Sequence, residues 1–523
     1  MSTYLSAYLI KVLAQNEVRL RLRRSSTMFA LLAVIAASWA MIADQAGGSS
    51  LLVIEKARVL YTSSALALGS STLAGLLFGL GGFYLVRGRM AEDIRSGTGS
   101  VIGATPVPNG LFLLGRWLGG VAYLSALVLC FMLTILALHG VRGHGPIELL
   151  VYLQTYLLLL LPMILFVTSC AVLFDSYAPL MGKGGDVLFF FVWIAQVSLM
   201  TQFDETTAQT PLSMVFDFSG LGVGVMVINN AFNVSSLHVG ASPFDPALPA
   251  LTLPAWLWTR ELVLLRLCAG VLALLPLLPA LLLFHRFSPD RVKRASARTR
   301  RSPLAIVNGW LRPLARLTRP VFALAARLPG LPGQVMADVA LTLASAPFAI
   351  LAIAAAAGAA LLLPYAQLGP LLIGVTAYWG ILISDLSTRD YQSAAEDMTG
   401  SVRGGTVQRY VRQFAATAVL GLLLTGLIGV RWLGDDPVRA LALASGLFAL
   451  SAAASLFGRC SRSGRLFLSL FLFGLYVAVN VNIVPRLDAV GFNGVANVAS
   501  ASLYLVLGAL MLAGGYLWNR RAI

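Results

Sequence analysis

Twelve long apolar segments restrict the fold of this chain more than any other feature of its sequence. They cover residues 26–43, 62–86, 111–138, 149–173, 187–202, 261–284, 344–363, 367–385, 412–430, 437–457, 466–483 and 498–518. A helix needs about 20 apolar residues to cross a bilayer. The chain is 58% hydrophobic and only 11% charged, whereas soluble domains carry about 25% charged residues. We therefore expect an all-α polytopic membrane protein with twelve transmembrane helices.

A polar motif occurs twice, once after the second apolar segment of each half. Residues 98–105 read Thr-Gly-Ser-Val-Ile-Gly-Ala-Thr, and residues 399–406 read Thr-Gly-Ser-Val-Arg-Gly-Gly-Thr. An Ala-Glu-Asp triplet precedes each copy, at 91–93 and 395–397. Such a repeat indicates a six-helix unit that was duplicated and fused. Because the preserved piece is a loop, we expect a partner outside the membrane to contact it.

The positive charge lies mostly in short loops between the apolar segments. The formal net charge is +16, which would suggest nucleic acid only if the cations formed a soluble patch. Their distribution instead follows the positive-inside rule and predicts that both termini are cytoplasmic. We expect no nucleic-acid partner.

The distribution of charged and apolar residues also predicts four segments along the chain. We expect an amphipathic surface helix over residues 1–25, a first transmembrane half over 26–285, and a second half over 344–523. A basic cytoplasmic linker and a second surface helix would occupy 286–343 and rest on anionic lipid. Segment 203–259 is too interrupted to cross the bilayer, so it would dip in and return or form a small cap.

Signatures of catalysis and metal binding are missing from the sequence. It contains no Walker loop, zinc-protease motif or nucleophile elbow. Its four cysteines and four histidines are scattered. The apolar segments hold few ionisable residues, Arg266 and Asp385 among them, whereas ion-coupled pumps need such groups. We expect no enzymatic site and no cofactor in this chain, and an energy source outside it.

The loop between the second and third apolar segments resembles that of ABC-2-type exporter permeases. In that family an acidic, Gly-containing turn precedes a small residue, Ser or Thr, Pro and Ile or Val, and a Gly-Lys or Gly-Arg pair opens the next helix. The matching residues here are Glu92, Asp93, Arg95, Gly97, Thr98, Pro106 and Gly115. The second half matches at Glu396, Asp397, Thr399, Gly400 and Gly404 but lacks the Pro and Gly-Arg elements.

The resemblance implies the ABC-2-type exporter fold and a permease subunit in the bacterial inner membrane. In that family a short helix in this loop docks on an ATP-binding subunit. It therefore implies two copies of a separate ATPase that carries the ATP and Mg, and it leaves room for a periplasmic or accessory subunit. The apolar interior favours an amphiphilic or hydrophobic substrate such as a lipid, peptide or toxin.

The resemblance also places the second and fifth helices of each half beside the substrate pathway. The polar or aromatic residues there are Ser70, Ser71, Thr72, Gln196, Tyr378, Trp379, Asn480 and Asn482. Ordinary helix packing is the alternative interpretation for each of them.

Two other functions fit twelve helices with a basic central linker. A major facilitator-type secondary transporter would carry a Gly-x-x-x-Asp-[Arg/Lys]-x-Gly-[Arg/Lys] loop between its second and third helices, and residues 87–97 depart from that pattern. A membrane enzyme or a non-transporting assembly factor would gather polar residues at one depth, and the sequence shows no such cluster.

Overall fold

A computed structural model describes residues 3–201, 214–232, 237–284, 303–401 and 404–521. The chain divides into two compact units, Met1–Arg300 and Arg301–Ile523. Their boundary falls within the expected linker, 286–343.

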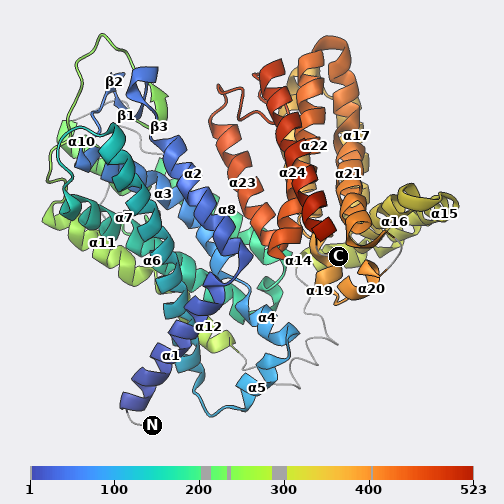
Figure 1. Ribbon diagram of the computed structural model, residues 1–523, viewed down its shortest axis with the longest axis horizontal. Helices are drawn as coiled ribbons and strands as arrows, with labels where there is room; N and C mark the ends of the chain where they lie inside the picture. The colour runs from blue at the N-terminus through green and yellow to red at the C-terminus, as the bar shows by residue number, and fades with distance from the viewer. Residues whose placement is uncertain (1–2, 202–213, 233–236, 285–302, 402–403, 522–523) are drawn as a thin grey trace. The chain divides into compact units, whose positions relative to one another are not determined.

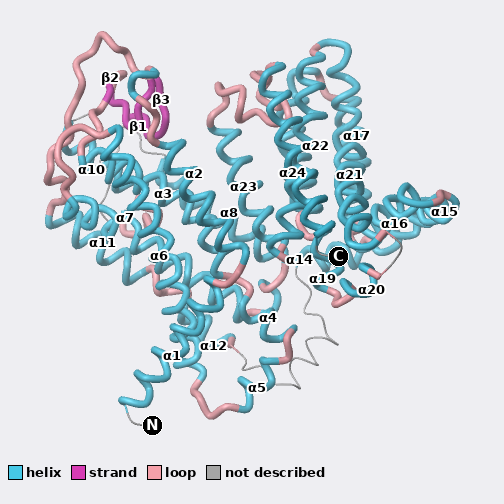
Figure 2. Tube along the Cα trace, in the orientation of Figure 1, coloured by secondary structure: helices cyan, strands magenta, loops and turns pink. Residues whose placement is uncertain are grey.

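The first unit is mainly helical and carries a small sheet (Figures 1 and 2). Its α-helices are α1 (Thr3–Leu22), α2 (Ser25–Met41), α3 (Ser63–Val86), α4 (Arg89–Arg95), α5 (Thr98–Ala104), α6 (Asn109–Arg142), α7 (Leu149–Ser176), α8 (Lys183–Thr201), α10 (Leu221–Phe232), α11 (Arg260–Leu272) and α12 (Leu277–Leu283). Its 3-10 turns are η1 (Gln45–Gly47) and η2 (Ala178–Leu180), and its strands are β1 (Ser49–Ile54), β2 (Ala57–Arg58) and β3 (Leu237–Pro243).

The described part of the second unit consists of helices and loops. Its α-helices are α14 (Pro303–Trp310), α15 (Arg319–Arg327), α16 (Gly330–Ser345), α17 (Phe348–Leu362), α18 (Leu368–Ile383), α19 (Arg389–Gln392), α20 (Glu396–Gly400), α21 (Gly405–Asp435), α22 (Pro437–Ser461), α23 (Gly464–Asn480) and α24 (Val498–Arg521). Its 3-10 turns are η3 (Arg312–Thr318), η4 (Tyr365–Gln367) and η5 (Leu386–Thr388).

A helix occupies each of the twelve segments expected to span the membrane. By length and composition, eight helices among the described residues suffice for a crossing, or up to ten if each of two bent pairs counts as one. The apolar helix α23 falls below that length, at 17 residues. The architecture is therefore that of an all-α polytopic membrane protein with fewer clear spans than twelve.

A sharp bend separates a helix from the apolar helix that follows it, once in each unit. The axes of α1 and α2 differ by 74°, and those of α16 and α17 differ by 100°. If α2 and α17 cross the bilayer, α1 and α16 run along its surface.

The three-stranded sheet is an element that the sequence patterns did not reveal. Its order is β2-β1-β3 with both pairs antiparallel. The tight turn between β1 and β2 places Glu55 and Lys56 at φ 48° and 69°, the left-handed backbone of a hairpin turn. Since β3 belongs to segment 203–259, part of this segment forms a small sheet together with residues 49–58.

A turn with the pattern Asp-x-x-Gly occurs in each unit, at residues 217–220 and 488–491. The first turn packs against α3, and the segment around the second turn packs against α18. Gly220 and Gly491 both have φ of 79°, a conformation that favours glycine. A Cβ on Gly75 of α3 would lie 2.3 Å from the Ser219 carbonyl oxygen, and one on Gly369 of α18 would lie 2.5 Å from the Phe492 carbonyl oxygen. Each turn therefore requires a glycine in the helix beside it.

Buried polar groups stabilise the turn of the first unit. The Asp217 carboxylate accepts hydrogen bonds from the Ser219 hydroxyl at 2.7 Å and from the amides of Gly220 and Val223 at 2.8 and 3.0 Å. Arg266 donates to the Asp217 carbonyl and to those of two α7 residues, Leu158 and Leu159. The arginine that interrupts the sixth apolar segment thus stabilises packing.

Candidate functional site

The first loop, residues 87–108, starts directly after α3, and buried polar contacts hold its first two residues in place. Arg87 is 1% exposed and forms ion pairs with Asp186 of α8 and, at 3.6 Å, with Asp175 of α7. Gly88 has φ of 97°, and its amide donates to Asp175 at 2.8 Å. The loop therefore begins at a buried, ion-paired junction of three helices.

An acid in the middle of the first loop and an acid of the surface helix α1 pair with the same arginine, which belongs to α6. Arg116 of α6 forms ion pairs with Glu17 of α1, Nε to Oε1 at 3.3 Å, and with Asp93 of α4 through Nη2. All three side chains are 6–7% exposed. Arg89 of α4 lies 3.3 Å from Glu17 and 3.6 Å from Asp93. These four residues, termed the Arg116 cluster, connect the surface helix, the loop and the next long helix.

Close helix packing brings Glu17 to the cluster. A Cβ on Gly115 would lie 2.6 Å from the Leu13 Cβ, and one on Gly119 would lie 2.5 Å from the Glu17 Cβ. Glycine at both positions of α6 therefore lets α1 approach closely. Gly115 is one of the residues on which the family resemblance depends, and this contact gives it a physical reason.

The two acids of the first loop are placed differently from each other. Glu92 is 43% exposed in its side chain and pairs with Arg24 and, at 2.8 Å, with Arg89. Asp93 is buried in the Arg116 cluster, so its charge does not face a soluble partner as the sequence suggested. Asp93 positions the loop, and Glu92 remains available for contact.

The exposed tip of the first loop includes Ile94 and α5. Ile94 and Val101 are 40% and 68% exposed, and Arg95, Gly97 and Thr98 are exposed beside them. On its other face α5 packs Ile102 against the core around Met90 and Phe112. Sequence reasoning selected the polar residues and missed Ile94 and Val101, although two large apolar side chains in a polar loop are a usable signal.

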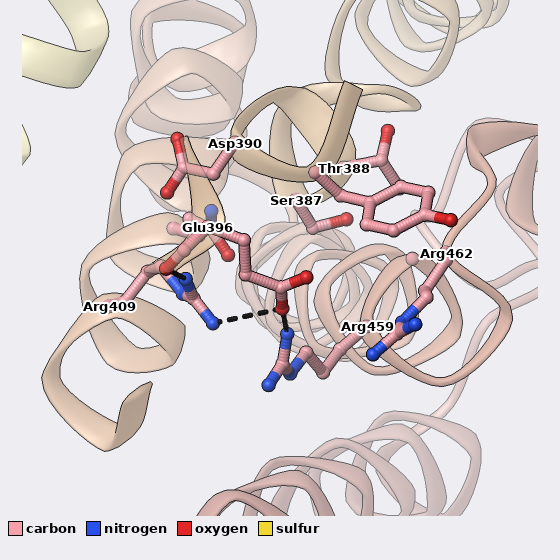
Figure 3. Close-up of a pocket in the computed structure, with 10 residues that line it drawn as sticks. Ser387, Thr388, Asp390, Glu396, Arg409, Arg459 and Arg462 are labelled. Atoms are coloured by element: carbon pink, nitrogen blue, oxygen red, sulfur yellow. Dashed lines mark hydrogen bonds and ion pairs between the residues drawn. The ribbon is translucent and has the colours of Figure 1, made fainter. Parts of the chain in front are cut away.

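The second loop, residues 384–404, has an acid with two arginine partners (Figure 3). Glu396 of α20 pairs with Arg409 of α21 at 3.2 Å and with Arg459 of α22. These three residues line a small pocket together with Ser387, Thr388, Asp390, Tyr391, Gln413, Gly458 and Arg462. Burial raises the pKa of the Glu396 carboxyl, but the two arginines outweigh it and hold that pKa below its ordinary value.

Asp390 connects the second loop to the surface helix of its unit. Arg412 of α21 forms ion pairs with Asp338 of α16, Nε to Oδ2 at 2.8 Å, and with Asp390 of α19, Nη2 to Oδ2 at 3.6 Å. These three residues are termed the Arg412 cluster, and their side chains are 17–20% exposed. Thr399 donates a hydrogen bond to Asp390 at 3.1 Å.

The remaining predicted residues of the second loop lie nearer its surface. Asp397 is exposed, and Met398 beside it is 75% exposed. Gly400 is half-buried. Gly404, with φ of 95°, precedes the first residue of α21. The exposed tip of this loop is therefore Asp397 and Met398.

Four of the eight expected pathway residues are buried within their own units. Ser70 bonds the Tyr156 hydroxyl at 2.7 Å, and Ser71 donates to a carbonyl one turn earlier. Thr72 packs against Gly224. The Trp379 indole donates to the Thr417 carbonyl at 3.1 Å. Packing within the unit accounts for these four side chains.

The other four expected pathway residues are more accessible. Tyr378 is half-buried and lies edge-on to Phe348. Gln196 is half-buried, and its Oε1 has no hydrogen-bond partner among the described residues. Asn480 and Asn482 are exposed. Among the eight, Gln196 is the residue with a buried side-chain oxygen that has no hydrogen-bond partner in the described part of the chain and is not a hydroxyl.

Within the described ranges, no group of three or more His, Cys, Asp or Glu residues could hold a metal ion. The four cysteines are unpaired. Comparison with known proteins finds no matching family model, curated protein or solved structure.

Proposed function

We propose that this chain is the fused membrane subunit of an ABC-2-type exporter. Two separate ATP-binding subunits would hydrolyse Mg-ATP and drive an amphiphilic or hydrophobic substrate outward across the bacterial inner membrane. Both termini would be cytoplasmic, and each loop would dock on one ATPase.

One observation carries this proposal. In each unit an arginine of the long helix after the loop bridges an acid of the loop and an acid of the surface helix. Beside these clusters, each loop exposes a tip with a large apolar side chain, Val101 or Met398. A loop that transmits force needs both a stiff connection to the spans and a free contact surface.

The test purifies the full chain from its native host through an affinity tag and identifies the proteins that copurify with it. We expect a complex of one copy of this chain and two ATPases, because one chain supplies two loops. Light scattering after size-exclusion chromatography measures this ratio. Two copies of this chain around one central pathway would contradict the proposal.

Substitutions at the loop tips test the contact itself. Val101→Glu together with Met398→Glu should lower ATPase assembly at least tenfold, because a buried apolar contact would gain an unpaired charge, and should leave the unfolding temperature unchanged. Val141→Glu is the matched control, since Val141 is 77% exposed at the other end of α6. If assembly survives the double substitution, the loops do not form the docking surface.

A further inference from the structure

The segment α14–η3–α15 combines exposed arginines with exposed apolar side chains. Arg312, Arg316, Arg319 and Arg327 are all exposed. No described residue forms an ion pair or side-chain hydrogen bond with these four guanidinium groups. The sequence has no Asp or Glu between positions 291 and 337. The segment therefore presents positive charge with no acid of its own to neutralise it.

Large apolar side chains lie on the same segment. The exposed fractions of Trp310, Leu317 and Leu324 are 78%, 59% and 46%. Ile306, Phe322 and Leu328 are also exposed. Leaving this much apolar surface in water is unfavourable, at about 25 cal/mol per Å². Arginine next to tryptophan and leucine is the composition of helices that lie in the headgroup region of a bilayer.

The packing of the segment fixes it to α16 and to the start of α17. It contacts α16, since a Cβ on Gly333 would lie 2.1 Å from the Leu328 carbonyl and 2.8 Å from that of Ala325. The Asn308 side chain of α14 accepts a hydrogen bond from the Phe348 amide at the start of α17, 3.2 Å away. Because α16 is bent by 100° from α17, α15 and α16 project sideways from the bundle of this unit (Figure 1).

We infer that α14–η3–α15 is a docking surface for anionic lipid headgroups. The four guanidinium groups would bind lipid phosphates, and the apolar side chains would enter the acyl boundary below them. A leaflet that carries anionic lipid supplies the missing negative charge. A soluble acidic protein would pair with the arginines but would leave Trp310 and Leu324 in water. This inference does not depend on the proposed ATPase partners.

The experiment uses the full chain in lipid nanodiscs, with its native cysteines replaced by alanine and Leu324→Cys labelled with an environment-sensitive fluorophore. We expect higher emission in phosphatidylcholine discs that contain phosphatidylglycerol than in discs of phosphatidylcholine alone. Each arginine should contribute about fivefold to the ratio of docked to undocked segment. Replacing all four arginines by glutamine should therefore return the emission to the level in neutral lipid.

Two controls separate charge from folding. The four Arg→Lys substitutions should keep most of the response, because lipid phosphates are attracted by charge. Arg19→Gln with Arg23→Gln, which removes one exposed arginine of α1 and one exposed arginine of the turn directly after it, should leave the response intact. High salt should weaken the response by screening.

Three outcomes would overturn the inference. They are equal emission in neutral and anionic discs, a response that survives the four Arg→Gln substitutions, and a change in emission that requires a soluble protein or a second copy of this chain.

Discussion

The Arg116 and Arg412 clusters have the same design but differ in burial. In each, the arginine Nε faces the acid of the surface helix, Glu17 or Asp338, and Nη2 faces the acid of the loop. The side chains of the Arg116–Glu17–Asp93 trio are 6–7% exposed, whereas those of the Arg412 cluster are 17–20% exposed. The first loop is therefore the more firmly held of the two.

The comparison also shows where the sequence repeat misleads. Aligning the two Ala-Glu-Asp triplets pairs Asp93 with Asp397. The ion pairs instead make Asp390 the counterpart of Asp93, because both contact the arginine that also holds the surface helix. Asp397 is exposed. The two units preserve an arrangement of charges in space, while the residues that supply it have changed position.

The largest expected effect comes from removing the shared arginines. Arg116→Ala would remove the nearest cation of the buried Asp93 and one of the three arginines that pair with Glu17, at a cost of about 3 kcal/mol. Arg412→Ala should cost less, about 1 kcal/mol, because water reaches its partners. Thermal unfolding of both purified variants in detergent measures the difference. Equal losses would show that burial does not distinguish the clusters.

Close packing of α1 on α6 gives the next effect. Gly119→Ala would place a Cβ 2.5 Å from the Glu17 Cβ and 3.1 Å from the Ala14 carbonyl oxygen. Such overpacking should destabilise the protein by about 1–3 kcal/mol. The control is Gly81→Ala in α3, where a Cβ would meet nothing within 4 Å. The control should be neutral or stabilising, by up to about 1 kcal/mol, because alanine favours helix. A neutral Gly119→Ala would mean that α1 is loosely docked.

A smaller effect distinguishes Asp390 from Asp397. Asp390→Asn removes a charge that faces Arg412 and should lower the free energy of unfolding by about 1 kcal/mol. Asp397→Asn should change it by less than about 0.5 kcal/mol, as expected for an exposed surface position. Chemical denaturation of the two variants provides the comparison. The reverse order would restore the equivalence that the sequence triplets suggest.

The smallest effect concerns the acidity of Glu396. Its pKa is held below the ordinary value in the folded protein, so its ion pairs stabilise the fold above the unfolded pKa of about 4.3. This contribution is lost as the pH falls through the folded pKa. The unfolding temperatures of wild type and Glu396→Gln should therefore differ at pH 7, by the equivalent of less than about 1 kcal/mol, and converge in acid. A difference that persists in acid would argue against charge pairing.

The sequence predicted features that depend on local composition. Apolar periodicity located a helix at each expected segment, and the repeated motif located both loops. Patterns could not reveal contacts between distant residues, such as the pairing of Glu17 with Arg116. The sheet was missed for the same reason, because β1 finds its partner β3 at residues 237–243. The burial of Asp93 likewise depends on contacts among α1, α4 and α6. The sequence alone could not show that this loop residue lies inside and not at the contact surface.

Close backbone contact along α3 and α18 has a mechanical consequence. Arg87, directly after the last residue of α3, is fixed between two aspartates, while Gly75 of α3 abuts the Ser219 carbonyl. α18 abuts the Phe492 carbonyl at Gly369, and a Cβ on Gly380 would lie 2.1 Å from the Phe471 ring. A helix that is closely packed at two positions along its length resists bending, since tightly packed interiors have low compressibility. A displacement of either loop would thus move the whole helix and the turn packed against it together, with little elastic strain.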